Sequence, residues 1–229
     1  MKTYYTIGTV GDAYIIVCKL YAMAKQEQVL CKHYPGFESL QPTIREIYSL
    51  MPNINVEFIN KRSSDVNVWG AFEHKQMEKE WNRYGIKQPE YYPEFELENI
   101  SHFNLPKSYI TLQIKAGTHE PYERNLSVNI IEEILNNSKL PIVIIGEKTI
   151  NLPAKDSNIL DLRNKTTIKE VINIIKNSNH FYGLLGFLSF VAASHKIMAD
   201  LWIKSPMDIN AVKIRQETAK EWGRYYFRR

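Results

Sequence analysis

Cysteine is nearly absent from this chain of 229 residues, which contains only Cys18 and Cys31. The two cysteines form no CxxC pair, and no Cys/His cluster accompanies them. The sequence therefore gives no support to a disulfide framework or to a zinc site of ordinary spacing. Cys18 lies in a helical pattern and Cys31 in a strand pattern, which predicts two buried thiols.

Long apolar runs are also missing. No window approaches the roughly 18 consecutive apolar residues of a membrane span, although 44% of the residues are hydrophobic and can form a core. The first ten residues lack the basic-then-apolar order of a secretory signal, so we expect a cytoplasmic protein. The formal charge of +4 suits an anionic ligand without requiring nucleic acid. The basic tail "KEWGRYYFRR" is either a phosphate contact or a solvated helix end.

The motifs of several large enzyme classes do not occur. The dinucleotide fingerprint GxGxxG and the P-loop GxxxxGK[ST] are both absent. There is no GxSxG nucleophile motif and no DxD pair, so a metal-dependent sugar-nucleotide site of the DxD type is unsupported. The histidines show neither HxxxH nor HExxH spacing. We expect neither a metal ion nor a cofactor.

The first 60 residues alternate between strand and helix patterns. Apolar spacing predicts strands over 3–8, 28–34 and 55–60, a helix over 11–25, and within 39–52 a helix that begins near Pro42. This β-α-β-α-β order is typical of a parallel sheet covered by helices. The next segment is aromatic and charged, with the spacing of an amphipathic helix over 71–84. A connector with two prolines follows and places a domain boundary near 95–106.

The alternation restarts at Ser108. We expect strands over 108–114, 141–146, 158–162, 180–185 and 197–203, and helices over 126–137, 167–178, 186–194 and 208–225. Thr167 and Glu170 fit a capping box. The fold class is therefore α/β, with a small first domain over 1–100 and a second domain over 106–206. The carboxyl-terminal helix, within 207–229, is expected to pack back toward the first domain because its aromatic residues need burial.

The turn after the first strand reads "GTVGD". Ligands of open parallel sheets bind beyond the carboxyl ends of the strands, so the residues after each strand matter most. Gly8 and Gly11 allow a sharp turn, and Asp12 stands at the start of the first helix. The carboxylate has two interpretations: it faces a ligand, or it is a favourable partner of the helix dipole.

The loop after strand 108–114 reads "KAGTHEPYERNLS". Lys115 and Arg124 bracket the flexible pair Gly117-Thr118, an arrangement suited to clamping a diphosphate. The alternative is a solvated, charged loop.

Two further strands end in glycine. Gly146, with Glu147 behind it, leaves room for a flat base beside the backbone. Gly186 and Ser189 begin a helix of small residues, whose amides are placed to meet a phosphate. Close helix–strand packing explains the same small residues without a ligand.

Taken in order, these segments resemble the ADP-heptose:lipopolysaccharide heptosyltransferase family of GT-B glycosyltransferases. The resemblance is strongest over 107–206, where the basic loop is followed by "PIVIIGE" and "LDLRNKTTIKEVINIIKNS". The stretch "IGTVGDAYIIVCKLYAMAK" is similar to the family's Gly-Asp turn and first helix. The resemblance covers the first 30 residues and about the last 120.

The resemblance implies two Rossmann-like domains facing a cleft, with the acceptor on 1–100 and the donor on 106–206. It implies metal-independent, inverting transfer of a hexosyl- or heptosyl-type sugar from a nucleoside diphosphate to a hydroxyl group. Asp12 matches the position of the family's general base. The expected donor-binding residues are Lys115, Gly117, Thr118, Arg124, Gly146, Glu147, Gly186 and Ser189, of which the two cations and the helix-start amides stabilise the leaving diphosphate.

The chain departs from the family at 185–190, which reads "LGFLSF" where the family has Asp-Ser-Gly-x-x-His. The missing acid and histidine leave two other functions open. One is a non-catalytic nucleotide- or nucleotide-sugar-binding module. The other is a phage-type, nucleic-acid-modifying glycosyltransferase that holds its polymer with the basic tail.

Overall fold

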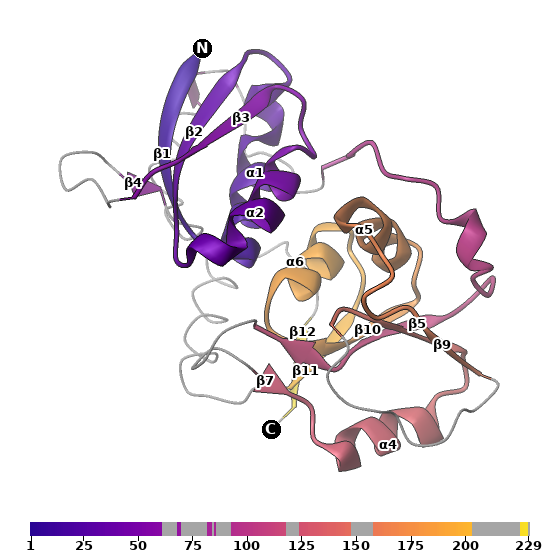
Figure 1. Ribbon diagram of the computed structural model, residues 1–229. Coiled ribbons are helices and arrows are strands. Elements are labelled where there is room, and N and C mark those ends of the chain that lie inside the picture. Colours follow the sequence, from indigo (N-terminus) through magenta and orange to yellow (C-terminus); the bar gives the residue numbers. More distant parts are fainter. Residues whose placement is uncertain are drawn as a thin grey trace. The chain divides into compact units, whose positions relative to one another are not determined.

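The computed structural model describes residues 1–60, 68–69, 82–83, 85, 93–117, 124–147, 158–202 and 225–228 (Figure 1). The chain divides into two compact units, with the change between Glu96 and Leu97, and residues 225–228 belong to the second unit. None of the helices in these residues has the length and apolar character that a membrane span requires. The helix expected over 71–84 lies almost entirely outside the described residues.

The first unit is built on a parallel sheet with the strand order β3-β2-β1-β4. Its elements are β1(Lys2–Gly8), α1(Val10–Ala24), β2(Val29–Pro35), η1(Glu38–Leu40), α2(Gln41–Tyr48), β3(Ile54–Phe58) and β4(Val68–Trp69). The β-α-β-α-β order expected for the first 60 residues is confirmed, and α1 and α2 lie side by side against the sheet (Figure 1). Strand β4 was not expected from the sequence.

The core of the first unit extends into the connector. The ring of Phe95 lies edge-on against Tyr14 and Tyr21 of α1, with ring centroids 6.1 and 5.8 Å apart. The Tyr21 hydroxyl donates a hydrogen bond of 3.0 Å to the carbonyl of Glu94. Aromatic pairs of this geometry stabilise by about 0.5–1.5 kcal/mol beyond their buried area. The first residues after the prolines are thus part of the first unit.

The second unit has a parallel sheet with the strand order β12-β11-β10-β5-β8-β9. Its elements are η2(Ser101–Phe103), β5(Ile110–Gln113), β6(Lys115–Ala116), β7(Arg124–Asn125), α4(Val128–Asn137), β8(Ile142–Ile145), β9(Ile159–Asp161), α5(Ile168–Lys176), β10(His180–Leu184), α6(Phe187–Ser194), β11(Ala199–Trp202) and β12(Tyr225–Arg228). The five strands expected up to residue 203 are confirmed. Helix α4 packs on one face of the sheet, and α5 and α6 lie on the other (Figure 1).

Both sheets contain a point where the strand order reverses. The first sheet grows from β1 toward β2 and β3, and β4 then pairs on the other side of β1. The second grows from β5 toward β8 and β9, and β10 then pairs on the other side of β5. In open parallel sheets the crossover connections diverge at this position and leave room for a ligand beyond the carboxyl ends of the strands. The "GTVGD" turn follows β1, and the "KAGTHEPYERNLS" loop follows β5.

Two local expectations differ from the structure. Residues 225–228, expected in or after a final helix, form strand β12 beside β11. The rest of the expected carboxyl-terminal helix lies outside the described residues. The loop after β5 also contains a short antiparallel ribbon, in which Lys115 pairs with Asn125 and Ala116 with Arg124. This ribbon folds the chain back so that both cations of the loop come near the sheet edge.

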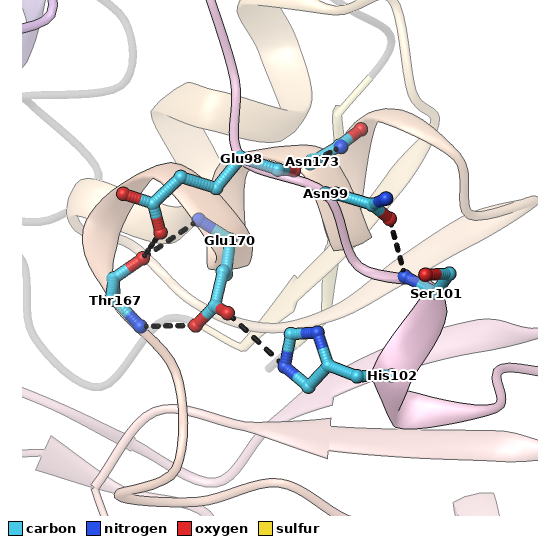
Figure 2. Close-up of polar contacts among 7 residues, drawn as sticks. All are labelled: Glu98, Asn99, Ser101, His102, Thr167, Glu170 and Asn173. Atoms are coloured by element: carbon cyan, nitrogen blue, oxygen red, sulfur yellow. Dashed lines mark hydrogen bonds and ion pairs between the residues drawn. The ribbon is translucent and has the colours of Figure 1, made fainter.

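The chain that enters the second unit is fixed to the start of α5 (Figure 2). The capping box expected there is confirmed: the Thr167 N–H donates to the Glu170 carboxylate at 2.8 Å, and the Glu170 N–H donates to the Thr167 hydroxyl at 3.1 Å. The Thr167 hydroxyl donates to the Glu98 carboxylate at 2.7 Å, and Asn173 donates to the Glu98 carbonyl at 2.8 Å. His102 Nε2 lies 3.2 Å from the other Glu170 oxygen. The first turns of α5 therefore hold the incoming chain at two residues, Glu98 and His102.

A buried polar cluster lies inside the first unit. His33 Nδ1 of β2 is 2.8 Å from the hydroxyl of Thr6 on β1 and 3.1 Å from the hydroxyl of Tyr48 on α2. All three side chains are almost fully shielded from water. Burial lowers the pKa of His33 to about 4, although the Gly8 carbonyl and the charge of Asp12 both favour protonation. The ring is therefore neutral at pH 7.

The buried His33 predicts a loss of stability in acid. The unfolded chain binds a proton near the ordinary histidine pKa of about 6.5, whereas the folded chain binds it only near a pKa of about 4. The unfolded state thus takes up more protons between these values, and the free energy of unfolding decreases as the pH falls through that window. From pH 7 to 4.5 we expect His33 to contribute a loss of about 2 kcal/mol, measured by urea unfolding.

The matched variant is His33→Gln, which has no titrating ring and should lose correspondingly less stability over the same interval. Burial also lowers the pKa of His195 to about 4, and this histidine contributes equally to both proteins. An identical pH dependence in the two proteins would contradict the assignment to His33.

Candidate functional site

The Asp12 carboxylate lies at the reversal point of the first sheet. Gly8 ends β1, Thr9 precedes α1, and Asp12 belongs to the first turn of that helix. Asp12 Oδ2 accepts a hydrogen bond of 2.9 Å from the Thr9 N–H and one of 3.2 Å from the Thr9 hydroxyl. The interpretation of Asp12 as a helix-start residue is thus correct for one of its two oxygens.

The second carboxylate oxygen of Asp12, Oδ1, takes no part in the hydrogen bonds with Thr9. Within the described ranges, Oδ1 accepts no hydrogen bond, and the residue is partly exposed. A carboxylate with one oxygen anchored and the other open has a defined orientation and a lone pair to offer. This is the arrangement that a general base needs for a hydroxyl proton. The helix-start role and the ligand-facing role are therefore compatible.

Gly8 makes room for this carboxylate. Its φ is +138°, and a Cβ atom added there would lie 2.3 Å from Asp12 Cβ and 2.6 Å from Asp12 Oδ2. Both the backbone conformation and the contact distance therefore require glycine. Gly11, in contrast, lies inside α1, so the turn depends on Gly8.

The reversal point of the second sheet carries an ion pair. Lys115, the first residue of β6, has its Nζ 3.2 Å from Oε2 of Glu147, which follows β8. The lysine side chain is 12% exposed and the glutamate side chain 49% exposed. A pair with one partner this exposed contributes at most about 1 kcal/mol, so it can rearrange around an anion at low cost. Gly146 and Gly117, beside these residues, both have positive φ angles, and Thr118 lies outside the described residues.

Arg124 is brought to the start of α6. The β6–β7 ribbon places Arg124 opposite Ala116, and the Leu126 N–H donates to the Ile114 carbonyl at 2.8 Å. A Cβ atom added to Gly186 would lie 3.7 Å from Ala116 Cβ and 4.0 Å from Arg124 Nη2. The guanidinium therefore adjoins the backbone at the end of β10, where the helix begins. A cation beside a helix start favours an anionic ligand.

Ser189 has a structural use in this arrangement. Its hydroxyl accepts a hydrogen bond of 3.0 Å from the Gly186 N–H and donates one of 2.8 Å to the Gly186 carbonyl. The side chain is fully buried. The hydroxyl thus shapes the first turn of α6.

One pair at this edge was missed from the sequence. Arg163 donates two hydrogen bonds, of 2.8 and 2.7 Å, to the two carboxylate oxygens of Asp161 at the end of β9. These bonds lower the pKa of Asp161. The next residue, Asn164, has a positive φ and donates its N–H to the Gly146 carbonyl at 2.9 Å. The signal was an Asp-x-Arg sequence directly after a strand, and its effect is to brace the end of β8.

The described part of the chain contains no group of three or more His, Cys, Asp or Glu side chains that could hold a metal ion. The histidine spacing does not single out His33, yet its Nε2 lies 3.1 Å from the Gly8 carbonyl oxygen. Most of the basic tail lies outside the described residues.

The fold is similar to that of known glycosyltransferases. ADP-heptose lipopolysaccharide heptosyltransferase II of E. coli superposes with a TM-score of 0.50 and 14% identity, over 90% of this chain and 86% of that chain. The iron-containing dodecameric glycosyltransferase TibC of enterotoxigenic E. coli H10407 gives 0.46 and 13%, over 88% and 61% of the two chains. The family 9 glycosyltransferase of Veillonella parvula gives 0.47 and 8%, over 87% and 80%. No protein-family model and no curated protein matches the sequence.

The expected resemblance to the heptosyltransferases is thus confirmed at the level of the fold. The chain has the α/β architecture with parallel sheets that this resemblance implies. At 14% identity the likeness concerns the fold, and the chemistry has to be argued from the residues of this chain.

The contact between Gly8 and Asp12 leads to a first test at this site. Gly8→Ala combines a disfavoured positive φ with a Cβ overlap, so it should reduce the free energy of unfolding by about 2 kcal/mol or more. Gly36→Ala is the matched control, because its Cβ atom would meet Thr9 Cγ2 at an ordinary 3.6 Å. Urea unfolding of both variants measures the difference, and equal stabilities would show that the turn does not require glycine at position 8.

Proposed function

We propose that this protein transfers a sugar from a nucleoside-diphosphate donor to a hydroxyl group of an acceptor, with inversion and without a metal ion. The first unit activates the acceptor through Asp12. The second unit binds the donor through the edge that carries Lys115, Gly117, Thr118, Arg124, Gly146, Glu147, Gly186 and Ser189.

The observation that carries this proposal is the cationic reversal point of the second sheet. Lys115 and Arg124 come from one loop and reach the ends of β8 and β10, next to a helix start. A diphosphate leaving group needs positive charge and hydrogen-bond donors where its own charge develops. The fold similarity to glycosyltransferases is consistent with this use of the edge.

The proposed reaction is a single displacement. Asp12 Oδ1 accepts the proton of the acceptor hydroxyl. At the same time, the oxygen of that hydroxyl forms a bond to the anomeric carbon of the donor sugar. The bond between that carbon and the diphosphate oxygen breaks, and the electron pair leaves with the nucleoside diphosphate. Attack from the face opposite the leaving group inverts the anomeric centre.

The two cations of the donor edge have different parts in this step. Arg124 presents a planar guanidinium, which can contact two phosphate oxygens at once. Lys115 supplies a point charge, and its present partner Glu147 is exposed enough to turn toward the hydroxyls of the donor. The departing charge is then neutralised within the protein instead of by a metal ion.

A binding module without transfer is the second candidate, and one observation favours it. The start of α6 has no acid or histidine, and the hydroxyl of Ser189 is occupied by the Gly186 backbone. Such a protein would bind a nucleotide at the second unit but would not need Asp12. The activity of the Asp12 variant below separates the two candidates.

The donor edge is tested by Arg124→Ala. A thermal-shift screen of UDP, GDP, ADP, CDP and TDP first identifies the nucleobase that the protein binds. A ligand at 100 times its dissociation constant raises the free energy of unfolding by roughly 2.7 kcal/mol. Loss of a charge-assisted hydrogen bond of about 1.5–3 kcal/mol should then raise the dissociation constant by roughly 10- to 150-fold. Lys139→Ala is the matched control, because this exposed lysine precedes β8 at the opposite edge of the sheet. Equal affinities of the two variants would remove Arg124 from the site.

The role of Asp12 as the general base is tested by Asp12→Asn. The amide oxygen can still accept the Thr9 hydrogen bonds, so the fold and nucleotide affinity should be preserved. Transfer should decrease by about 100-fold or more, which is the scale of general base catalysis. The control is Glu57→Gln, which neutralises an exposed acid on β3 and should leave turnover unchanged. Unchanged turnover in Asp12→Asn would exclude Asp12 as the base, and a wild type that binds the donor but never transfers or hydrolyses it would indicate the binding module.

A further inference from the structure

The buried cluster of the first unit ends at the turn that carries Asp12. His33 Nε2 lies 3.1 Å from the carbonyl oxygen of Gly8. A carbonyl oxygen only accepts hydrogen bonds, so Nε2 carries the proton and donates it. Nδ1 is then the acceptor of the ring, within donor distance of the hydroxyls of Thr6 and Tyr48, which also lie 3.1 Å from each other. The Gly8 carbonyl thus selects the tautomer with the proton on Nε2.

The ring has little freedom to leave this orientation. It is fully buried, and the ring of Phe58 on β3 meets it edge-on at a centroid distance of 6.2 Å. The ring of Tyr48 on α2 lies on another side of the imidazole, with the two ring centroids 5.5 Å apart. The charged or titratable groups that act on the ring are Tyr48 and, from α1, Asp12. The hydrogen bond to Gly8 is therefore made by a rigid donor that is neutral at pH 7.

The Gly8 carbonyl and the Thr9 N–H belong to the same peptide group. This group is planar, so its oxygen and its hydrogen keep a fixed geometry. His33 donates to the oxygen, and the N–H at the other end donates to Asp12 Oδ2 at 2.9 Å. The two hydrogen bonds also polarise each other through the amide. A single peptide thereby connects the buried ring to the carboxylate.

We propose that His33 is a positioning residue for Asp12, acting through the Gly8–Thr9 peptide; this rests on the proposed role of Asp12 as the base. His33 does not touch the acceptor. It holds the peptide plane, which orients Oδ2 and leaves Oδ1 directed for proton transfer. Misplacing a reacting group by about 1 Å can reduce a rate by as much as 100-fold, so a loss of this anchor should appear in the rate of transfer.

The test compares His33→Leu with His33→Gln. Leucine fills the space without a donor, whereas the glutamine amide can donate to the Gly8 carbonyl. In His33→Leu, the Thr9 amide should exchange with solvent at least 10-fold faster by NMR, and kcat should decrease by about 10-fold or more at unchanged donor KM. His33→Gln should recover most of both quantities. The control His195→Leu removes a partly buried histidine of the second unit and should change neither.

The exchange measurement separates this inference from the proposed function. If the wild type shows no transfer, the proposed function fails, and the Thr9 amide still decides whether His33 holds the turn. Wild-type exchange and kcat in folded His33→Leu would overturn the positioning role, and so would a His33→Gln that behaves like His33→Leu. If His33→Leu does not fold, Thr6→Val removes the shorter bond to Nδ1 and should speed Thr9 exchange by about 3-fold. An unchanged rate in Thr6→Val would then overturn the proposal.

Discussion

Parallel strand pairing is the constraint on which both units of this protein depend. It directs the carboxyl ends of all strands in a sheet to one edge, and a reversal of the strand order opens that edge at one position. In the first sheet the position follows β1, and in the second it lies between β5 and β10. At these points a carboxylate lies in one unit and two cations lie in the other. The chemical difference between the units arises from a few loop residues on similar scaffolds.

Asp12 and Arg124 are placed by backbone contacts, whereas Lys115 is paired with the Glu147 carboxylate. Asp12 is anchored by the Thr9 amide and packs against Gly8, where a Cβ atom would overlap it. Arg124 reaches the start of α6 because the β6–β7 ribbon folds the loop back on itself. The end of β8 is braced in the same way by the amide of Asn164. For Asp12, this anchor leaves Oδ1 without a hydrogen bond among the described residues.

The elements that the sequence predicted well are those with long periodic patterns or local capping signals, such as α1, β8 and the Thr167–Glu170 box. The missed features depend on partners that are distant in the chain. Strand β12 forms only because β11 offers an edge, and the two-residue strands β6 and β7 are too short for any periodicity. His33 looked like an ordinary strand residue, since its partners are 27 and 15 residues away. The carboxylate and both cations could be found from their place after strands, but not the contacts that orient them.

The central claim is that the reversal point of the second sheet binds a nucleoside diphosphate. Titrating the protein with the stabilising nucleotide while recording backbone amide spectra tests this most directly. We expect shifts for Gly117, Gly146 and Gly186, at the carboxyl edge of the second sheet, and none for Ser138 or Asn179, at its amino edge. Shifts confined to the amino edge, or no binding of any nucleoside diphosphate, would contradict it.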